Sequence, residues 1–208
     1  MTDPDRRRHW DGVYSAKAED EVSWFEESPA LSLELIAACG AGPDSAIVDI
    51  GGGASRLVDA LVDRGFTKVS VLDLSSKALA VAKARLGARG ASVQWIAADV
   101  TSWKPSGQFD VWHDRATLHF LTEPTDRAAY VEALTAALRP GGCAIIGTFA
   151  LDGPERCSGL PVVRYDSVAL ARVLGPAFAL AETRLHEHRT PLGAVQRFQF
   201  SRFRKAAG

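Results

Sequence analysis

Residues 48–57, "VDIGGGASRL", place an aspartate and three consecutive glycines between an apolar run and a segment with helical spacing. A glycine run weakens any regular element that contains it. We therefore interpret Gly51, Gly52 and Gly53 as a turn that leads from a strand into a helix. A turn without Cβ atoms also allows another group to approach the backbone closely.

The chain around this turn alternates between two kinds of pattern. Short runs rich in β-branched or aromatic residues predict five buried parallel strands at 46–50, 68–72, 93–97, 108–112 and 143–149. Helical patterns separate them at 55–64, 76–89 and 125–138. Right-handed crossovers then give an α/β fold with a doubly wound sheet. Two later strand-like segments, 180–188 and 195–203, predict a hairpin that closes the sheet as its sixth and seventh strands.

The N-terminal segment predicts a helical extension, residues 1–40, ahead of one globular domain at 41–208. Ser28 and Pro29 are typical of a helix start, and that helix is expected to run to about residue 39. Four aromatic residues precede it: Trp10, Tyr14, Trp24 and Phe25. Such apolar surface indicates either a lid or pocket wall, or a helix packed permanently on the sheet. The basic run 6–8 is interpreted as a solvated terminus.

Composition excludes several classes of function. The 208 residues are 47% hydrophobic and 24% charged, with a net charge of −1, so no nucleic-acid partner is expected. No apolar stretch reaches the roughly 18 residues of a membrane span. Three cysteines without CxxC spacing favour free thiols in the cytoplasm. His186 and His188 are interpreted as a solvated strand face, and no metal site is expected. We expect a monomer or a weak homodimer.

Two further acids follow predicted strands. Asp73 ends the second strand, 22 positions after Gly51, and Asp99 ends the third. Ligands of doubly wound sheets bind at the carboxyl ends of strands, where Asp73 can accept hydrogen bonds from both ribose hydroxyls. A carboxylate or neighbouring amide at Asp99 can contact an adenine edge. These acids favour an adenosine-type ligand over a bare turn. NAD is one alternative, although the turn does not complete the GxGxxG spacing.

The four segments "VDIGGGAS", "VLDLS", "AADV" and "LRPGG" occur in an order that resembles the class I S-adenosylmethionine-dependent methyltransferases. Ser55 stands where that family usually has a third glycine. The resemblance covers roughly residues 40–150 and implies a seven-stranded, Rossmann-like sheet whose last strand is antiparallel. It also implies S-adenosylmethionine as the cofactor. The implied cofactor-binding residues are Asp49 and Gly51, Gly52 and Gly53 near the methionyl part, Asp73 and Leu74 at the ribose, Asp99 and Val100 at the adenine, and Trp24 in the extension.

A second, shorter resemblance concerns the segment after the fourth strand. The run 114–118, "DRATL", is similar to a run in the thiopurine S-methyltransferase branch. It implies that Asp114 and Arg115 line the reaction pocket, with Arg115 holding an anionic or polarised acceptor. The alternative is that these two residues form a structural ion pair.

Other residues are candidates for catalysis or acceptor binding. His113 and His119 are candidate bases, and His119 is preferred because it lies beyond the strand end. Tyr14 and Phe25 are expected to contact the acceptor, whereas Cys157 is expected to be inert.

The sequence therefore predicts a methyltransferase that acts on a small-molecule acceptor, with a thiol or another soft sulfur nucleophile favoured. A thiolate needs no base, whereas an amine or a hydroxyl does. Two alternatives stay open. A protein-lysine methyltransferase would have an open acidic groove instead of an enclosed aromatic pocket, and a nucleoside-binding module would hold the ligand without turnover.

Overall fold

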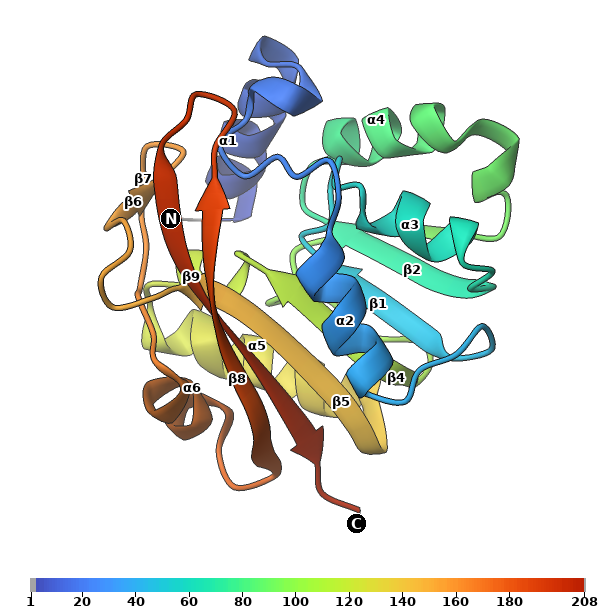
Figure 1. Ribbon diagram of the computed structural model, residues 1–208, viewed down its shortest axis with the longest axis vertical. Coiled ribbons are helices and arrows are strands. Elements are labelled where there is room, and N and C mark those ends of the chain that lie inside the picture. Colours follow the sequence, from blue (N-terminus) through green and yellow to red (C-terminus); the bar gives the residue numbers. More distant parts are fainter. Residues whose placement is uncertain (1–2, 208) are drawn as a thin grey trace.

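The computed structural model describes residues 3–207, and its centre is a seven-stranded sheet with the order β3-β2-β1-β4-β5-β9-β8 (Figure 1). Its strands are β1 (Ala46–Ile50), β2 (Lys68–Asp73), β3 (Gln94–Ala97), β4 (Phe109–Arg115), β5 (Leu138–Phe149), β8 (Phe178–Arg189) and β9 (Val195–Lys205). The first five strands are mutually parallel. The last strand, β9, pairs antiparallel with β5 and with β8. The predicted fold class, with its antiparallel last strand, is confirmed.

Helices cover both faces of the sheet. One face is covered by α2 (Ala30–Ala38), α3 (Leu57–Asp63) and α4 (Ser76–Leu86), the other by α5 (Pro124–Ala137) and α6 (Ser167–Leu174). Leu35 and Leu61 pack with Ile47 in the first layer, and Tyr130 and Leu170 belong to the second with Trp112. The two apolar layers fix which side chains of each strand face which helices.

Short elements complete the chain: the 3-10 turns η1 (Glu19–Glu21), η2 (Gly87–Gly90) and η3 (Leu118–Phe120), and a two-stranded ribbon of β6 (Arg156–Cys157) and β7 (Leu160–Pro161). An N-terminal helix, α1 (Asp3–Ala16), contacts α4 and lies over the upper end of the sheet in Figure 1. The division at residue 40 stays a prediction. Within residues 3–207, no helix has both the length and the apolarity needed to cross a membrane.

The fourth strand differs from its predicted form. It was expected to end at residue 112, but β4 continues to Arg115 because residues 111–115 pair with β5, and 111–114 also pair with β1. His113, Asp114 and Arg115 are therefore strand residues. Successive side chains of a strand point to opposite faces, so Asp114 points away from the face that His113 and Arg115 share.

Candidate active site

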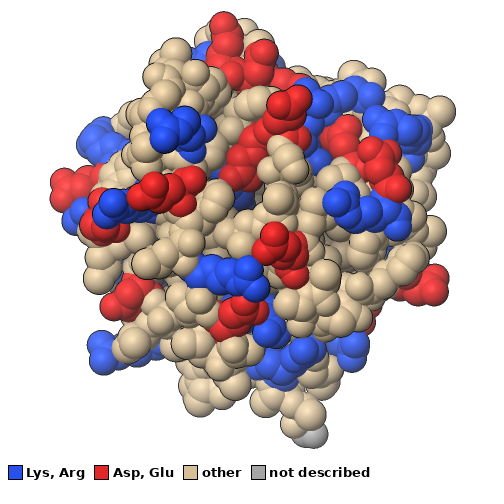
Figure 2. Space-filling view, viewed as in Figure 1, with Lys and Arg blue, Asp and Glu red and all other residues tan. Residues whose placement is uncertain are grey.

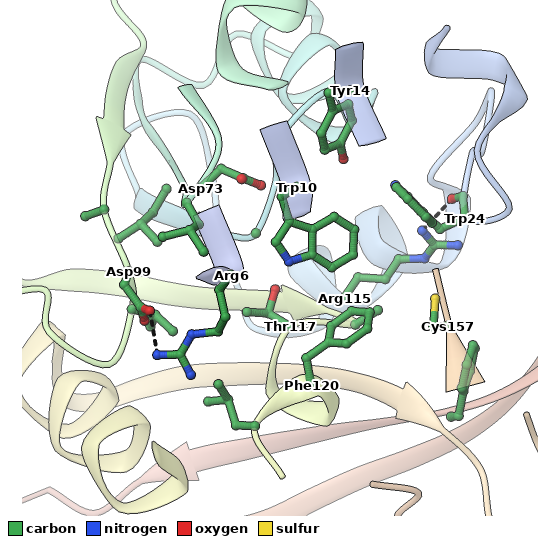
Figure 3. Close-up of a pocket in the computed structure, with 18 of the residues that line it drawn as sticks. Arg6, Trp10, Tyr14, Trp24, Asp73, Asp99, Arg115, Thr117, Phe120 and Cys157 are labelled. Atoms are coloured by element: carbon green, nitrogen blue, oxygen red, sulfur yellow. Dashed lines mark hydrogen bonds and ion pairs between the residues drawn. The ribbon is translucent and has the colours of Figure 1, made fainter. Parts of the chain in front are cut away.

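A cavity lies at the carboxyl ends of the parallel strands (Figure 3). One end is lined by the residues that follow β2 and β3, including Leu74 and Val100. The other end is lined by Arg115, Phe149, Cys157, Gln196 and Phe198. Gly51, which follows β1, also lines the cavity. Since β1 lies between β2 and β4 in the sheet, the glycine turn lies between the two ends of the cavity.

Asp73 lies at the first end and is 8% exposed. Its Oδ1 accepts a hydrogen bond from the Ser75 amide at 2.7 Å. Burial raises the pKa of Asp73 to about 7, and the negative charges of Asp49 and Asp11 add to this effect. A carboxylate that ionises near neutral pH therefore lines the wall where the sequence predicted a ribose contact.

Asp99, at the same end, already has protein partners. Its Oδ1 accepts hydrogen bonds from the amide and the hydroxyl of Thr101, at 2.8 and 2.7 Å. Its Oδ2 is 2.8 Å from a guanidinium nitrogen of Arg6 (Figure 3). Arg6 also forms an ion pair with Asp126 at 2.8 Å. The Arg6 side chain is only 14% exposed, so interpreting this part of the basic run as solvated was wrong. The reason is tertiary: α1 lies across the cavity and brings Arg6 to two carboxylates that are distant in sequence.

The glycine turn is required by the protein's own packing. Gly51 and Gly53 have φ angles of +65° and +44°, which residues with a Cβ rarely adopt. A Cβ at Gly51 would collide with the Thr117 hydroxyl, and one at Gly53 would lie 2.9 Å from Oδ2 of Asp73. The turn therefore brings backbone against the walls of the cavity, although Gly52 and Gly53 are not among the residues that line it.

Aromatic side chains of the N-terminal segment cover the cavity. Trp10 packs edge-on against Trp24 at 5.7 Å and against Phe120 at 5.0 Å, measured between ring centroids. Tyr14 packs against Trp24 at 6.2 Å, and burial near Asp73 raises its pKa well above the ordinary value. Trp24 and Tyr14 thus line the cavity, as expected for the lid or pocket wall that the N-terminal aromatic residues indicated. Phe25 lines a smaller neighbouring cavity instead, where the Arg56 guanidinium lies 5.8 Å from its ring.

Asp114 does not line the cavity, which corrects the expectation from sequence. Its carboxylate is fully buried and accepts hydrogen bonds from the Thr117 and Leu118 amides and from the Tyr130 hydroxyl, at 2.7, 3.0 and 2.6 Å. Burial raises its pKa to about 6. These contacts fix the turn after β4 to α5, and they explain why a catalytic role is not proposed for Asp114.

Arg115 does line the cavity, and its ion-pair partner is not Asp114. The guanidinium is 3.0 Å from Glu26, donates a hydrogen bond to the Trp24 carbonyl at 2.8 Å, and lies 5.3 Å from the Phe198 ring centroid. The predicted alternative of an Asp114–Arg115 pair is wrong because the two side chains leave β4 on opposite faces. Glu26 was missed by the sequence reasoning, since nothing local connects it to β4.

His119 is fully buried and lies behind the cavity wall. Its ring packs against Phe120 and Phe149, with centroids at 4.4 and 4.8 Å, and it is not among the lining residues. Burial, and secondarily the charge of Arg115, lowers its pKa to about 3. In this position the imidazole is neutral and does not reach an acceptor in the cavity, so we do not propose it as the base.

Three other predicted residues lie near Arg115. Cys157 lines the cavity, and burial raises the pKa of its thiol to about 11. Nε2 of His188 is 2.7 Å from the Ser23 carbonyl oxygen, and both His186 and His188 lie 3.5 Å from Glu26. The interpretation of His188 as solvated was wrong, since it is 3% exposed. Among the described residues, no group of three or more possible ligands could hold a metal ion.

Comparison with known proteins finds a family model that matches the central part of the chain. Residues 47–142 match the family model described as "Methyltransferase domain". The chain is 34% identical, over 104 residues, to the ubiquinone biosynthesis O-methyltransferase of Thiobacillus denitrificans. That alignment covers 49% of this chain and 43% of the relative. It is 29% identical, over 157 residues, to the EEF1A lysine methyltransferase 2 of Danio rerio. This second alignment covers 67% of this chain and 66% of the relative. The chain thus spans less than two thirds of the length of either relative.

Among solved structures, one from work on the conversion of a disulfide bond into a thioacetal group during echinomycin biosynthesis is similar throughout. Its TM-score is 0.76 at 21% identity, and the alignment covers 97% of this chain and 92% of that one. At this identity the similarity establishes the fold and leaves the acceptor open.

Proposed function

We propose that this chain, whose residues 47–142 match a family model described as "Methyltransferase domain", transfers the methyl group of S-adenosylmethionine to a small-molecule acceptor, with a sulfur nucleophile favoured. The domain match supports the enzyme class and the cofactor expected from the sequence. The similarity to the thiopurine S-methyltransferase branch stays a prediction.

The residues at the first end of the cavity fit this cofactor. Asp73 presents a buried carboxylate for ribose hydroxyls, and Leu74 and Val100 provide apolar walls for a purine ring. Asp99 lies beside them as the hydrogen-bond acceptor for an exocyclic amine, currently shared with Arg6. When bound, S-adenosylmethionine supplies a methyl group already activated by its sulfonium.

The other end of the cavity, which contains Arg115, is the proposed acceptor end, and its side chains favour one kind of nucleophile. Arg115 and Cys157 are the ionisable groups among its described lining residues, and the Cys157 thiol stays protonated at neutral pH. Neither provides a general base. The buried Arg115 guanidinium favours an anionic acceptor by charge attraction in a low-dielectric wall. An acceptor that is nucleophilic once ionised, such as a thiolate, therefore fits this end better than a neutral amine or alcohol.

Methyl transfer also needs an aligned acceptor in a pocket that holds little water, and the N-terminal aromatic residues contribute to both. Trp10, Trp24 and Phe120 pack against one another and line the cavity, so they reduce its contact with water and restrict the orientation of a bound acceptor.

A screen for S-adenosylhomocysteine release tests this function. Purified protein is incubated with S-adenosylmethionine and with thiols, sulfide, selenols, amines or small carboxylates. We expect release with at least one thiol or selenol, increasing with pH as the acceptor ionises. Release with amines alone would refute the sulfur preference. Cofactor binding without release in any arm would favour the nucleoside-binding alternative.

One observation favours a second candidate, a protein-lysine methyltransferase. A surface groove that includes Glu26, the ion-pair partner of Arg115, has four acidic residues in its lining, Asp20, Glu26, Glu27 and Glu187, together with Arg189 and two histidines. Such a groove suits a basic peptide, and one relative is a lysine methyltransferase. Both signs of charge are nevertheless interspersed on the face shown in Figure 2. A lysine-containing peptide in the same screen distinguishes this candidate.

A further inference from the structure

Three buried polar side chains from three different elements meet beneath the glycine turn. His113 of β4 lies between Asp49 of β1 and Ser32 of α2. Its Nδ1 is 2.7 Å from Oδ1 of Asp49, and its Nε2 is 2.9 Å from the Ser32 hydroxyl. Each of the three residues is 2% exposed, so the set is closed to solvent.

Both ring nitrogens of His113 have hydrogen-bond partners within this set. An ionised carboxylate only accepts hydrogen bonds, so Nδ1 of His113 donates to Asp49. The Ser32 hydroxyl can donate to Nε2 or accept from it, because it rotates to suit the ring. His113 is therefore held at both nitrogens, and Asp49 keeps a partner for its buried charge.

The second carboxylate oxygen of Asp49 lies directly against the turn. A Cβ at Gly52 would be only 2.5 Å from Oδ2 of Asp49. The Asp49 charge also acts on both ends of the cavity: it contributes to the raised pKa of Asp73, and it favours the charged form of Arg115. The position of this one carboxylate thus affects the turn and the residues on either side of it.

Ser32 and His113 also line a second, smaller cavity that shares wall residues with the main one. The shared residues are Tyr14, Trp24 and Arg115. The three-residue set is therefore adjacent to the ligand cavity and does not belong only to the packed interior.

We propose that His113 is a positioning residue for cofactor binding. It joins Asp49 to Ser32 and so holds the carboxylate, and the glycine turn above it, in the arrangement that receives the cofactor. This inference rests on the proposed function, because it assumes that S-adenosylmethionine binds at this turn. It assigns His113 no contact with the reacting atoms.

Calorimetric titration of the full chain with S-adenosylmethionine tests the proposal. In His113→Phe the ring loses both hydrogen bonds and the Asp49 charge is left unpaired, so we expect affinity to fall about tenfold or more. In His113→Asn the amide nitrogen replaces Nδ1 as a donor to Asp49, so most of the affinity should return. Ser32→Ala removes only the outer hydrogen bond and should weaken binding about threefold.

Tyr130→Phe is the matched control. It also removes a hydrogen-bond donor from a buried carboxylate, that of Asp114, but on the opposite face of the sheet. It should lower the free energy of unfolding and leave cofactor affinity unchanged. If it weakens binding as much as His113→Phe does, lost stability explains the effect and the positioning role is overturned.

The outcomes separate this inference from the proposed function. Wild-type protein that does not bind S-adenosylmethionine refutes the proposed function. Wild-type protein that binds, with equal affinity in folded His113→Phe, overturns only the role of His113. If His113→Phe does not fold, unchanged affinity in Ser32→Ala has the same consequence.

Discussion

Asp114 and Arg115 are consecutive residues of β4 whose side chains act on opposite sides of the sheet. The Asp114 carboxylate accepts a 2.6 Å hydrogen bond from Tyr130 of α5, whereas the Arg115 guanidinium lies 3.0 Å from Glu26 on the other side. The alternation of side chains along a strand prevents both residues from lining one pocket. Of the two, only Arg115 is placed to affect an acceptor.

Arg115→Ala should reduce turnover more than it reduces cofactor affinity. Removing the buried guanidinium takes away the positive charge at the acceptor end, and we expect kcat/KM for an anionic acceptor to fall by about 100-fold. The Kd for S-adenosylmethionine should change by less than about threefold. Steady-state kinetics and calorimetry measure the two effects. Arg184→Ala, which removes an exposed ion pair with Glu34, is the control and should leave both values unchanged.

Asp73→Ala should weaken binding of the cofactor. A ribose enclosed in the cavity would lose its charged hydrogen-bond acceptor, which costs about 1.5–3 kcal/mol. Calorimetry with S-adenosylhomocysteine measures this loss without turnover. Wild-type affinity in the variant would remove Asp73 from the binding site.

The stability of the ligand-free protein should decrease between about pH 4 and pH 7. The pKa values of Asp73 and Asp114 are raised to about 7 and about 6. A carboxyl with a raised pKa binds its proton more tightly in the folded state, so its stabilising contribution is complete below the unfolded value of about 4. That contribution is lost as pH rises through the folded-state pKa.

Urea unfolding at pH 5 and pH 8 checks this dependence. Asp73→Asn, which does not titrate, should lose less stability than the wild-type protein over that interval. An equal loss in the two proteins would show that Asp73 titrates normally.

Arg6→Ala should loosen the helix that covers the cavity. Arg6 connects α1 to Asp99 and Asp126, so its removal should increase hydrogen exchange in residues 3–16 and speed cofactor dissociation. Mass-spectrometric exchange and stopped-flow release measure the two effects. Arg8→Ala is the control because that side chain is 80% exposed. If exchange in α1 is unchanged by Arg6→Ala, the two ion pairs of Arg6 do not hold this helix over the cavity.

Much of the fold could be predicted because its determinants are local. The apolar runs, the glycine turn and the acids at strand ends each occupy a few consecutive residues, and the handedness of βαβ connections converts their order into a sheet. The predicted end of the fourth strand was wrong because His113, Asp114 and Arg115 appear polar in sequence. Pairing with β1 and β5 keeps His113 and Asp114 in the ladder, and pairing with β5 keeps Arg115 there.

The sequence alone determined the order of strands and helices and the positions of the glycine turn, Asp73 and Asp99, because these depend on short-range pattern and chain direction. Only the tertiary structure decided the partners of the charged and polar side chains: Arg6 with Asp99, Arg115 with Glu26, and His113 with Asp49 and Ser32. Those partners are between 64 and 93 positions apart in the sequence. Burial would leave their polar groups unsatisfied unless the packed elements brought them together.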